Sequence, residues 1–360
     1  MSASTSDNTE TTFWDWMLAH DQWPAFDRLL FLVYGPKIMG VLRAVAELGV
    51  ADHLKDGPRT IEELAKLTDS QEQPLFRLLR TSAALRIVRQ DAEGRFELTE
   101  EGESLRSDLS SSLRDLVVFS GDEMLTRPYS DLVHSVRTGA PAFEKVYGKS
   151  FYEYTESSPE AGALFDKTMT QRSWLTAVTL LRRVDLKPFK KIADLGGGWG
   201  HFLGEALTKH YPDATALLFE RPSVLEQAKP LIADYGVTDR VELQAGDFFE
   251  SVPKGYDAYL LNAVLNGLDD EQSARVLAKV REAIGMDKDA RLFIFEKVMT
   301  PSTNEWDYSK LLDMDMLVLF GGRERTLEDW HKLTSEAGFE LLTTPEKGGS
   351  PWSALECRVK

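Results

Sequence analysis

An acidic residue lies near the end of the first strand that we expect in the second half of the chain, and glycines follow it. The segment IADLGGGWGHF places Gly196, Gly198 and Gly200 after that strand, and Asp194 stands just before them. The dinucleotide fingerprint would require a third spaced glycine where the chain has His201. A carboxylate at Asp194 would disfavour a pyrophosphate, but it can bind a cationic group directly or through water. The loop therefore favours a cationic ligand over a dinucleotide.

The next two expected strands also end in groups that suit such a ligand. Glu220 follows the second strand, about twenty residues beyond the loop, where an acid can accept hydrogen bonds from both ribose hydroxyls. Asp247 closes the third strand and offers a carboxylate to an adenine amino group, and Phe248 offers a ring to stack on the base. Each residue alone is more simply a surface acid or a core aromatic. Together with Asp194 they predict S-adenosylmethionine, which carries an ammonium and a sulfonium and no phosphate.

The segment YDAYLLNAVLNGLDDEQ, residues 256–272, lies where an open α/β sheet usually places its reacting groups. It has the pattern of a buried strand that breaks at Asn266-Gly267 and continues as a helix with acidic residues at its start. The polar side chains at the break are Asn262 and Asn266, and an amide cannot exchange a proton near pH 7. We therefore expect a reaction site without a side-chain base at this strand end.

Alternating strands and helices after residue 184 predict the sheet that would bring these residues together. The order is that of an α/β, Rossmann-like sheet of seven strands, and the last two strands are close enough in sequence to form an antiparallel edge pair. The expected strands are 192–195, 214–219, 241–245, 257–261, 292–296, 339–342 and 354–359.

The first part of the chain has the pattern of a winged helix. Helical periodicity over 26–53, a capping box at Thr60, a helix from Pro74 and a hairpin around 91–94 give that order. The helix that would read DNA offers only Arg77 and Arg80, which is not a basic face, so we predict a protein-packing role. The expected domains are a winged-helix-like dimerisation domain (14–110), a helical linker and substrate-cleft region (111–183) and an S-adenosylmethionine-binding domain (184–360).

Composition excludes several classes of partner. The 360 residues carry a formal net charge of −16, which disfavours nucleic acid and anionic membrane surfaces. No apolar run approaches the ~20 residues of a membrane-spanning helix. Cys357 is the single cysteine, and the first twelve residues are polar and acidic, so we expect a cytoplasmic protein without a disulfide. No histidine has metal-ligand spacing, so no metal is expected.

From about residue 20 to its end, the chain resembles a known family. This family is the class I S-adenosylmethionine-dependent small-molecule O-methyltransferases of the caffeic acid and acetylserotonin type, with their bacterial natural-product relatives. The resemblance implies a homodimer in which the N-terminal domain intertwines with its mate and contributes to the partner's substrate pocket. The motifs that carry it are, in order, FYEY, FDKTMTQRS, DLGGGWG, GDFFESVP, LDDEQSARVLAKVREA, GGRERTLEDWHKL and AGF.

The same resemblance assigns residues to the cleft. Met169 and Ser173 are implied to line its cofactor and substrate side, as are Phe151, Met316 and Phe320. Plain core packing explains methionine and aromatic residues at such positions equally well, because these side chains mostly fill cores.

One departure from the family concerns its base. Members usually carry Lys-x-x-x-His-Asp-Trp before the acidic helix start, and the His deprotonates the acceptor hydroxyl. Here Asn262 stands at the Lys position, Asn266 at the His position, and Gly-Leu replaces Asp-Trp. The two acids that flank the His in the family correspond to Glu296 and Glu324. The resemblance thus implies that the scaffold and the flanking acids are present without the base.

The leading hypothesis is a methyltransferase of secondary metabolism that acts on a small aromatic or polyketide-like molecule. In it Asn266 orients the acceptor, Glu296 or Glu324 can take up a proton, and oxygen, nitrogen and carbon all remain open as the methylated atom. The alternative is a family member that binds S-adenosylmethionine for a non-methylating cyclisation, rearrangement, hydroxylation or decarboxylation. A metabolite-binding winged-helix regulator is disfavoured by the acidic charge, and a nicotinamide oxidoreductase by Asp194.

Overall fold

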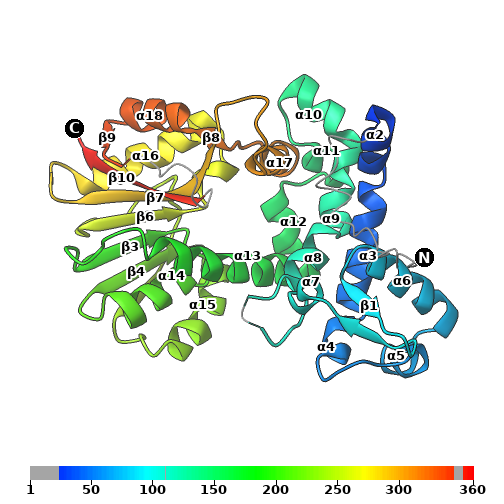
Figure 1. Cartoon of the computed structure of the whole chain (residues 1–360). Coiled ribbons are helices and arrows are strands. Elements are labelled where there is room, and N and C mark those ends of the chain that lie inside the picture. Colours follow the sequence, from blue (N-terminus) through cyan, green and yellow to red (C-terminus); the bar gives the residue numbers. More distant parts are fainter. Residues whose placement is uncertain (1–23, 110, 344–351) are drawn as a thin grey trace, which may run out of the picture. The chain divides into compact units, whose positions relative to one another are not determined.

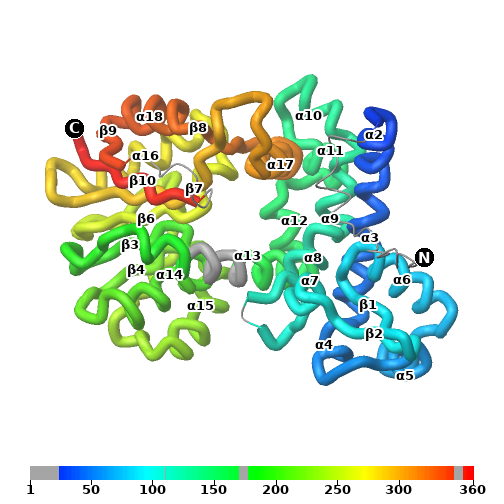
Figure 2. Tube along the Cα trace, in the orientation of Figure 1, coloured from blue at the N-terminus to red at the C-terminus, as the bar shows by residue number. Residues whose placement is uncertain are grey.

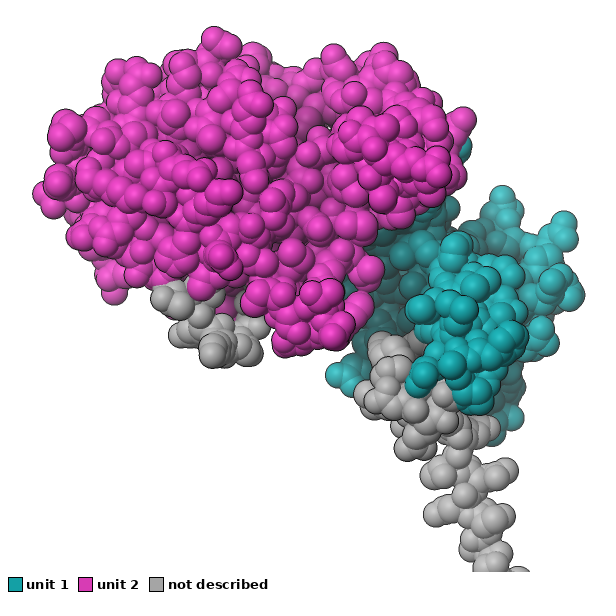
Figure 3. All heavy atoms as spheres, turned by 90° about the horizontal axis from the view of Figure 1, so that it is seen from above, with its two compact units in different colours: residues 1–126 teal, residues 127–360 magenta. Residues whose placement is uncertain are grey.

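The computed structural model describes residues 24–109, 111–343 and 352–360, without the side chains of residues 170–176. The chain divides into two units, residues 1–126 and 127–360 (Figure 3). The division falls at one point between Thr126 and Arg127. The three domain ranges expected from the sequence therefore remain a prediction.

The first unit contains the helices and the hairpin that the winged-helix pattern predicts. The capping box is confirmed, because Thr60 Oγ1 accepts a hydrogen bond from Glu63 N and the Glu63 carboxylate accepts one from Thr60 N. The helix expected from Pro74 begins two residues earlier, since proline in a first turn has no helical hydrogen bond to lose. The elements are α2 (Ala25–Val33), α3 (Gly35–Glu47), α4 (Val50–Leu54), α5 (Ile61–Leu67), α6 (Glu72–Ala84), β1 (Val88–Gln90), β2 (Phe96–Leu98), α7 (Glu100–Glu103), α8 (Arg114–Ser120) and α9 (Glu123–Thr126).

The apolar side chains of helix α2 are not buried by the rest of the unit. Phe26 is 73% exposed, Leu29 64% and Leu32 69%, whereas Val50, Leu64 and other apolar residues of the following elements form a closed core. Among the described residues, no single helix is long and apolar enough to span a membrane. Helices α2 and α3 reach that length and composition together, with a bend of 44° between them.

The second unit is built on the predicted doubly wound sheet (Figure 1). Its strands run in the order β5-β4-β3-β6-β7-β10-β9, and β10 is antiparallel to both of its neighbours. The seven predicted strands are confirmed. The short strand β8, which pairs with an extension of β7, was not predicted. The strands are β3 (Lys191–Leu195), β4 (Thr215–Glu220), β5 (Val241–Ala245), β6 (Ala258–Asn262), β7 (Arg291–Met299), β8 (Arg325–Thr326), β9 (Phe339–Leu341) and β10 (Trp352–Val359).

Helices cover both faces of this sheet, which explains why its central strands are apolar throughout. Side chains such as Ile192 belong to the core under α13, α14 and α15, and alternate ones such as Ala193 to the core under α16 and α18. In Figure 2, α14 and α15 lie on one side of the sheet and α16 and α18 on the other. The helical elements are η2 (Pro128–Asp131), α10 (Leu132–Thr138), α11 (Ala142–Tyr147), α12 (Phe151–Ser157), α13 (Pro159–Leu180), α14 (His201–Glu205), η3 (Ala206–His210), α15 (Pro222–Asp234), η4 (Leu265–Gly267), α16 (Asp270–Ile284), α17 (Ser309–Asp315), η5 (Met316–Phe320) and α18 (Leu327–Glu336).

Candidate active site

The glycine loop turns the chain sharply between β3 and α14. Gly196, Gly198 and Gly200 have φ values of 73°, 61° and 88°, which side chains other than glycine rarely adopt. Gly197 is required for a different reason: a Cβ there would lie 2.3 Å from Asp194 Oδ2. The Asp194 carboxylate therefore lies directly against the backbone of the loop.

Asp194 is a buried acid without a protein partner. Its side chain is fully buried, and neither carboxylate oxygen has a hydrogen-bond partner among the described residues. Burial first, and then the nearby Glu220, raise the pKa of Asp194 to about 7. A buried acid of this kind suits a cationic ligand, because a positive charge would stabilise its ionised form.

Glu220 and Phe248 both approach Gly196 of the same loop. An ideal Cβ built on Gly196 would lie 3.3 Å from Phe248 Cε1 and 3.9 Å from Glu220 Oε2. Glu220 Oε1 accepts a hydrogen bond from Arg221 N at 2.8 Å, and burial raises the pKa of this carboxyl. Asp247 is exposed at the end of β5, and its Oδ1 accepts a hydrogen bond from Phe249 N at 2.8 Å. An acid and a ring thus flank the loop, an arrangement that fits a ribose and a base.

The segment that the sequence predicts as the reaction end of the site forms a short turn after β6. Asn262 is half-buried at the end of the strand, and Ala263 follows with φ 53°, an uncommon value for a residue with a side chain. The chain then forms the 3₁₀ turn η4. Glu296 Oε1, from β7, accepts hydrogen bonds from Leu265 N at 3.0 Å and Asn266 N at 3.1 Å. One buried carboxyl therefore fixes the backbone that carries Asn266.

The side chain of Asn266 is held by a second acid. Its Nδ2 donates a hydrogen bond to Glu324 Oε1 at 3.3 Å, and Lys297 Nζ lies 3.5 Å from the same oxygen. Asn266, Lys297 and Glu324 are all at most 8% exposed. Burial, followed by the charge of Glu324, raises the pKa of Glu296 to about 8. At neutral pH this cluster orients an amide and holds a protonated carboxyl, but it places no histidine base at position 266.

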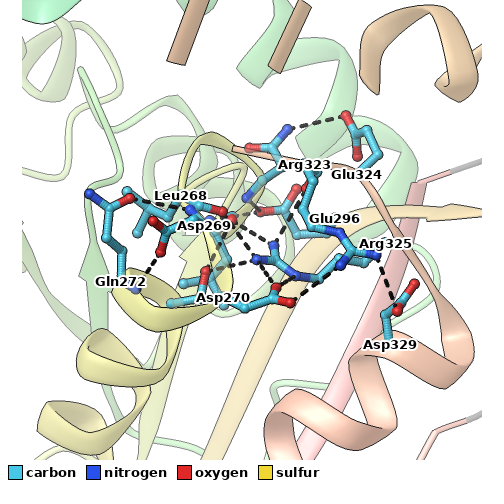
Figure 4. Close-up of polar contacts among 12 residues, drawn as sticks. Leu268, Asp269, Asp270, Gln272, Glu296, Arg323, Glu324, Arg325 and Asp329 are labelled. Carbon is cyan, nitrogen blue, oxygen red and sulfur yellow. Dashed lines mark hydrogen bonds and ion pairs between the residues drawn. The ribbon is translucent and has the colours of Figure 1, made fainter. Parts of the chain in front are cut away.

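A buried arginine and a glycine also contact the turn. Arg325 donates hydrogen bonds to Leu265 O at 2.7 Å and Leu268 O at 3.1 Å, and it pairs with Asp270 at 2.8 Å (Figure 4). A Cβ on Gly322 would lie 2.2 Å from Asn266 O, so the two backbone segments touch there. The turn is therefore positioned by contacts from β7, β8 and the loop before β8.

Aromatic residues of α12 and η5 form one wall next to these elements. The ring centroids of Phe151 and Phe320 are 4.7 Å apart, and Tyr152 lies 5.7 Å from Phe320. Met169 and Met316 are half-buried on α13 and η5. The side chain of Ser173 lies outside the described residues. Phe151 is 1% exposed and Phe320 is half-buried, so the two rings pack together, and their place in a substrate cleft remains a prediction.

Sequence reasoning missed Gly197, Lys297, Gly322 and Arg325. Lys297 had a visible signal, since it is a charged residue inside the apolar run LFIFEKVM. The two glycines gave none, because their need for space depends on segments distant in sequence. No group of three or more His, Cys, Asp or Glu side chains suited to a metal occurs in the described part of the chain.

The doubly wound sheet with its acid-bearing strand ends defines a class I methyltransferase. The family model of the O-methyltransferase domain matches residues 129–340, and that of the O-methyltransferase dimerisation domain matches residues 32–108. The chain belongs to the O-methyltransferase family.

Three relatives illustrate the range of the family. The chain is 37% identical to an 8-amino-8-demethylriboflavin N,N-dimethyltransferase of Streptomyces davaonensis, over 94% of this chain and 97% of the relative. It is 35% identical to a phenazine O-methyltransferase of Lysobacter antibioticus, over 88% and 92%. A crystal structure of an O-methyltransferase from neocarzinostatin biosynthesis, in complex with S-adenosylmethionine and 2-hydroxy-5-methyl naphthoic acid, matches with a TM-score of 0.76. The identity is 30%, and the match covers 90% of this chain and 96% of that chain.

Proposed function

We propose that the protein transfers a methyl group from S-adenosylmethionine to a nitrogen atom of a planar aromatic metabolite. The observation that carries this proposal is the amide of Asn266 at the position where the family has its base. Such a site favours an acceptor atom that is nucleophilic without prior loss of a proton.

The cofactor residues are assigned from the strand ends. Asp194 would receive the ammonium group beside the glycine loop, Glu220 the ribose hydroxyls, and Asp247 with Phe248 the adenine. The side chain of Ser173 and the backbone of Gly196, Gly198 and Gly200 would complete this surface. When bound, S-adenosylmethionine supplies a methyl group on a positively charged sulfur. The carboxylate of Asp194 supports this assignment, because none of the described residues donates a hydrogen bond to it.

A methyltransferase site without a histidine base can still accelerate methyl transfer over the uncatalysed reaction. General-base assistance is typically worth about 10²–10⁴-fold, or roughly 3–5 kcal/mol of barrier. Alignment of two bound reactants can supply about 7–11 kcal/mol. The site would still align the acceptor with the methyl group. The residues proposed to hold the acceptor are Phe151, Phe320, Met169 and Met316, near Asn262.

An aromatic amine fits this site better than an ordinary phenol. Its nitrogen carries a free electron pair at neutral pH, attacks the methyl carbon as the carbon–sulfur bond breaks, and then releases a proton to solvent. A phenol with a pKa of about 10 is ionised in only about one molecule in a thousand at pH 7. The 37% identical relative is named for methylation of an amino group, which supports the choice of nitrogen.

Oxygen methylation is the second candidate. The matching family model is that of an O-methyltransferase domain, and the phenazine relative is named for O-methylation. In this chain it would require an acceptor hydroxyl acidic enough to ionise by itself. The relatives reported above are all named for methyl transfer, so they give no support to the non-methylating hypothesis.

The test is product analysis with a defined panel of acceptors. The panel comprises 8-amino-8-demethylriboflavin, 2-aminophenazine and 2-hydroxyphenazine, and mass spectrometry measures the methylated product and S-adenosylhomocysteine together. We expect one S-adenosylhomocysteine per methyl transferred and preference for the amines. Methylation of the hydroxyphenazine alone would show that the acceptor atom is oxygen and not nitrogen. Conversion of an acceptor without S-adenosylhomocysteine would contradict methyl transfer altogether.

We also propose that the protein is a homodimer formed through the first unit. The apolar side chains of α2 are exposed, and part of this helix lies in the region that matches the dimerisation model. Light scattering should give about twice 40.5 kDa, and the double variant Leu29→Glu with Leu32→Glu should give a monomer. A wild-type monomer with full activity would refute the interface. The cytoplasmic location stays a prediction from the sequence.

A further inference from the structure

A buried lysine stands next to the acid that holds Asn266. Lys297 lies on β7 with 2% of its side chain exposed, and its Nζ is 3.5 Å from Glu324 Oε1. The same Nζ is 4.2 Å from the centre of the Trp352 ring, which adds a cation–π contact. A lysine is rarely this buried, because removal of its charge from water is costly unless the charge is compensated. Its position at the reaction end of the site therefore calls for an explanation.

The carboxamide of Asn266 has two chemically different ends. Its Nδ2 donates to Glu324 Oε1 at 3.3 Å, so the amide nitrogen faces Glu324 and Oδ1 is directed elsewhere. An ionised carboxylate can only accept hydrogen bonds, whereas a protonated carboxyl can also donate one. A protonated Glu324 could therefore hold Asn266 by Oδ1 and turn the amide nitrogen towards the acceptor.

We propose that Lys297 is a positioning residue that determines which end of the Asn266 carboxamide faces the acceptor. By pairing with Glu324 it keeps this carboxylate an acceptor for Asn266 Nδ2, and Asn266 Oδ1 is left to receive a hydrogen bond from an N–H or O–H of the acceptor. The inference rests on the proposed function, since it concerns how that function selects its substrate.

The other charged groups around Glu324 do not replace Lys297. Glu296 is a carboxyl group, which is neutral or negative, so it cannot supply the positive charge. Asp313 accepts a hydrogen bond from Glu324 N at 2.8 Å. The guanidinium of Arg325 is bound to Asp270 and to backbone carbonyls of the turn. Among the described residues, the ion pair of Glu324 is with Lys297.

The consequence is selectivity for acceptors that donate a hydrogen bond. An aromatic amine presents an N–H to Asn266 Oδ1 while its electron pair faces the methyl group. A phenolate presents only lone pairs, which the amide oxygen would repel. Loss of the lysine charge would leave the buried Glu324 carboxyl without its cation, which favours a neutral carboxyl that donates to Asn266 Oδ1. The Asn266 amide would then rotate, and turnover of oxyanion acceptors would increase.

The first test needs no substrate. Infrared difference spectra of the full-length protein at pH 7, Lys297→Met minus wild type, should show one additional protonated carboxyl band. The band should be missing in the double variant Lys297→Met with Glu324→Gln, and missing in Lys297→Arg, which keeps the charge. Lys297→Gln replaces the methionine variant if the latter does not fold. A folded neutral variant without the additional band would overturn the proposal.

The second test follows the acceptor preference with the matched pair 2-aminophenazine and 2-hydroxyphenazine. In Lys297→Met the ratio of amine to hydroxyl turnover should fall about 10- to 100-fold, the scale of one lost orienting hydrogen bond. It should recover in Lys297→Arg, which keeps the charge. An unchanged ratio overturns the proposal even if the carboxyl band appears. If the wild type gives no methylated product, the proposed function is wrong. The infrared result would still show whether Lys297 keeps Glu324 ionised.

Discussion

The proposed cofactor end and the proposed reaction end of this site are built in different ways. At the cofactor end, Asp194, Glu220 and Phe248 each lie at or near the end of their own strand, and parallel strands bring them together. At the reaction end, Asn266 is held by Glu296, Glu324 and a backbone contact with Gly322, which come from segments up to 58 residues away in sequence. The first arrangement follows from the sheet alone, whereas the second depends on how separate segments pack. Variants at the reaction end should therefore lose turnover, and variants at the cofactor end should lose cofactor affinity.

The largest effect is expected from Gly322→Ala. The new Cβ would lie 2.2 Å from Asn266 O, so the turn must move, which should reduce turnover by about 100-fold or more and destabilise the protein by about 1–3 kcal/mol. Cofactor affinity should remain within about threefold, because the cofactor end does not depend on this contact. Single-turnover rates, thermal unfolding and calorimetric titration with S-adenosylhomocysteine measure the three quantities.

Gly40→Ala is the matched control for this substitution. A Cβ at Gly40 in helix α3 meets no atom within 4 Å, so the same chemical change should leave turnover intact. Equal loss of cofactor affinity and turnover in Gly322→Ala would show that the two ends are not separate.

Glu220→Ala should affect the cofactor end alone. Loss of charge-assisted hydrogen bonds to the ribose is expected to weaken S-adenosylhomocysteine binding by about 1.5–3 kcal/mol, or roughly 10- to 150-fold. The exposed Glu242 on β5 provides the control variant Glu242→Ala, which should bind normally. An unchanged dissociation constant in Glu220→Ala would remove this residue from the site.

This contrast also explains what the sequence could and could not predict. The doubly wound sheet could be predicted from the periodicity of its strands and helices. The acids at the ends of β3 and β4 could be predicted from their place in the sequence next to the expected strand ends. The position of Asn266 was evident by resemblance, and so were Glu296 and Glu324. The cation at Lys297 and the close approach at Gly322 could not be placed, because both depend on the path of β8 and its preceding loop past the turn. The strand β8 itself has only two residues, which is too short for a periodic signal.

A smaller effect is expected from the pH dependence of cofactor binding. Burial raises the pKa of Asp194 from 3.8 to about 7, so the free protein holds this proton up to nearly neutral pH. This group therefore lowers the free energy of unfolding as pH rises from about 4 to 7, because the unfolded state has already lost the proton. A cationic ligand binds the ionised form, so affinity for S-adenosylhomocysteine should fall about tenfold from pH 7.5 to pH 6.

Calorimetric titration of Asp194→Asn should give weak binding without this pH dependence. The exposed Asp213 provides the control, since Asp213→Asn should reproduce the wild-type profile. A wild-type affinity that is constant from pH 6 to 7.5 would mean that Asp194 does not meet the cationic group.

The central claim is that methyl transfer proceeds without a titrating base at position 266. The most direct measurement is the single-turnover rate of methylation between pH 5.5 and 7.5 at saturating S-adenosylmethionine, with 2-aminophenazine for wild type and 2-hydroxyphenazine for Asn266→His. This range contains the ordinary histidine pKa of about 6.5 and lies below the raised pKa of Glu296. We expect a flat profile for wild type with the amine. For Asn266→His with the hydroxyl acceptor we expect a rate that rises through about pH 6.5, because the imidazole can then take the hydroxyl proton. A wild-type rate that climbs close to tenfold per pH unit across this range, with S-adenosylhomocysteine formed in step, would contradict it and require a base elsewhere in the site.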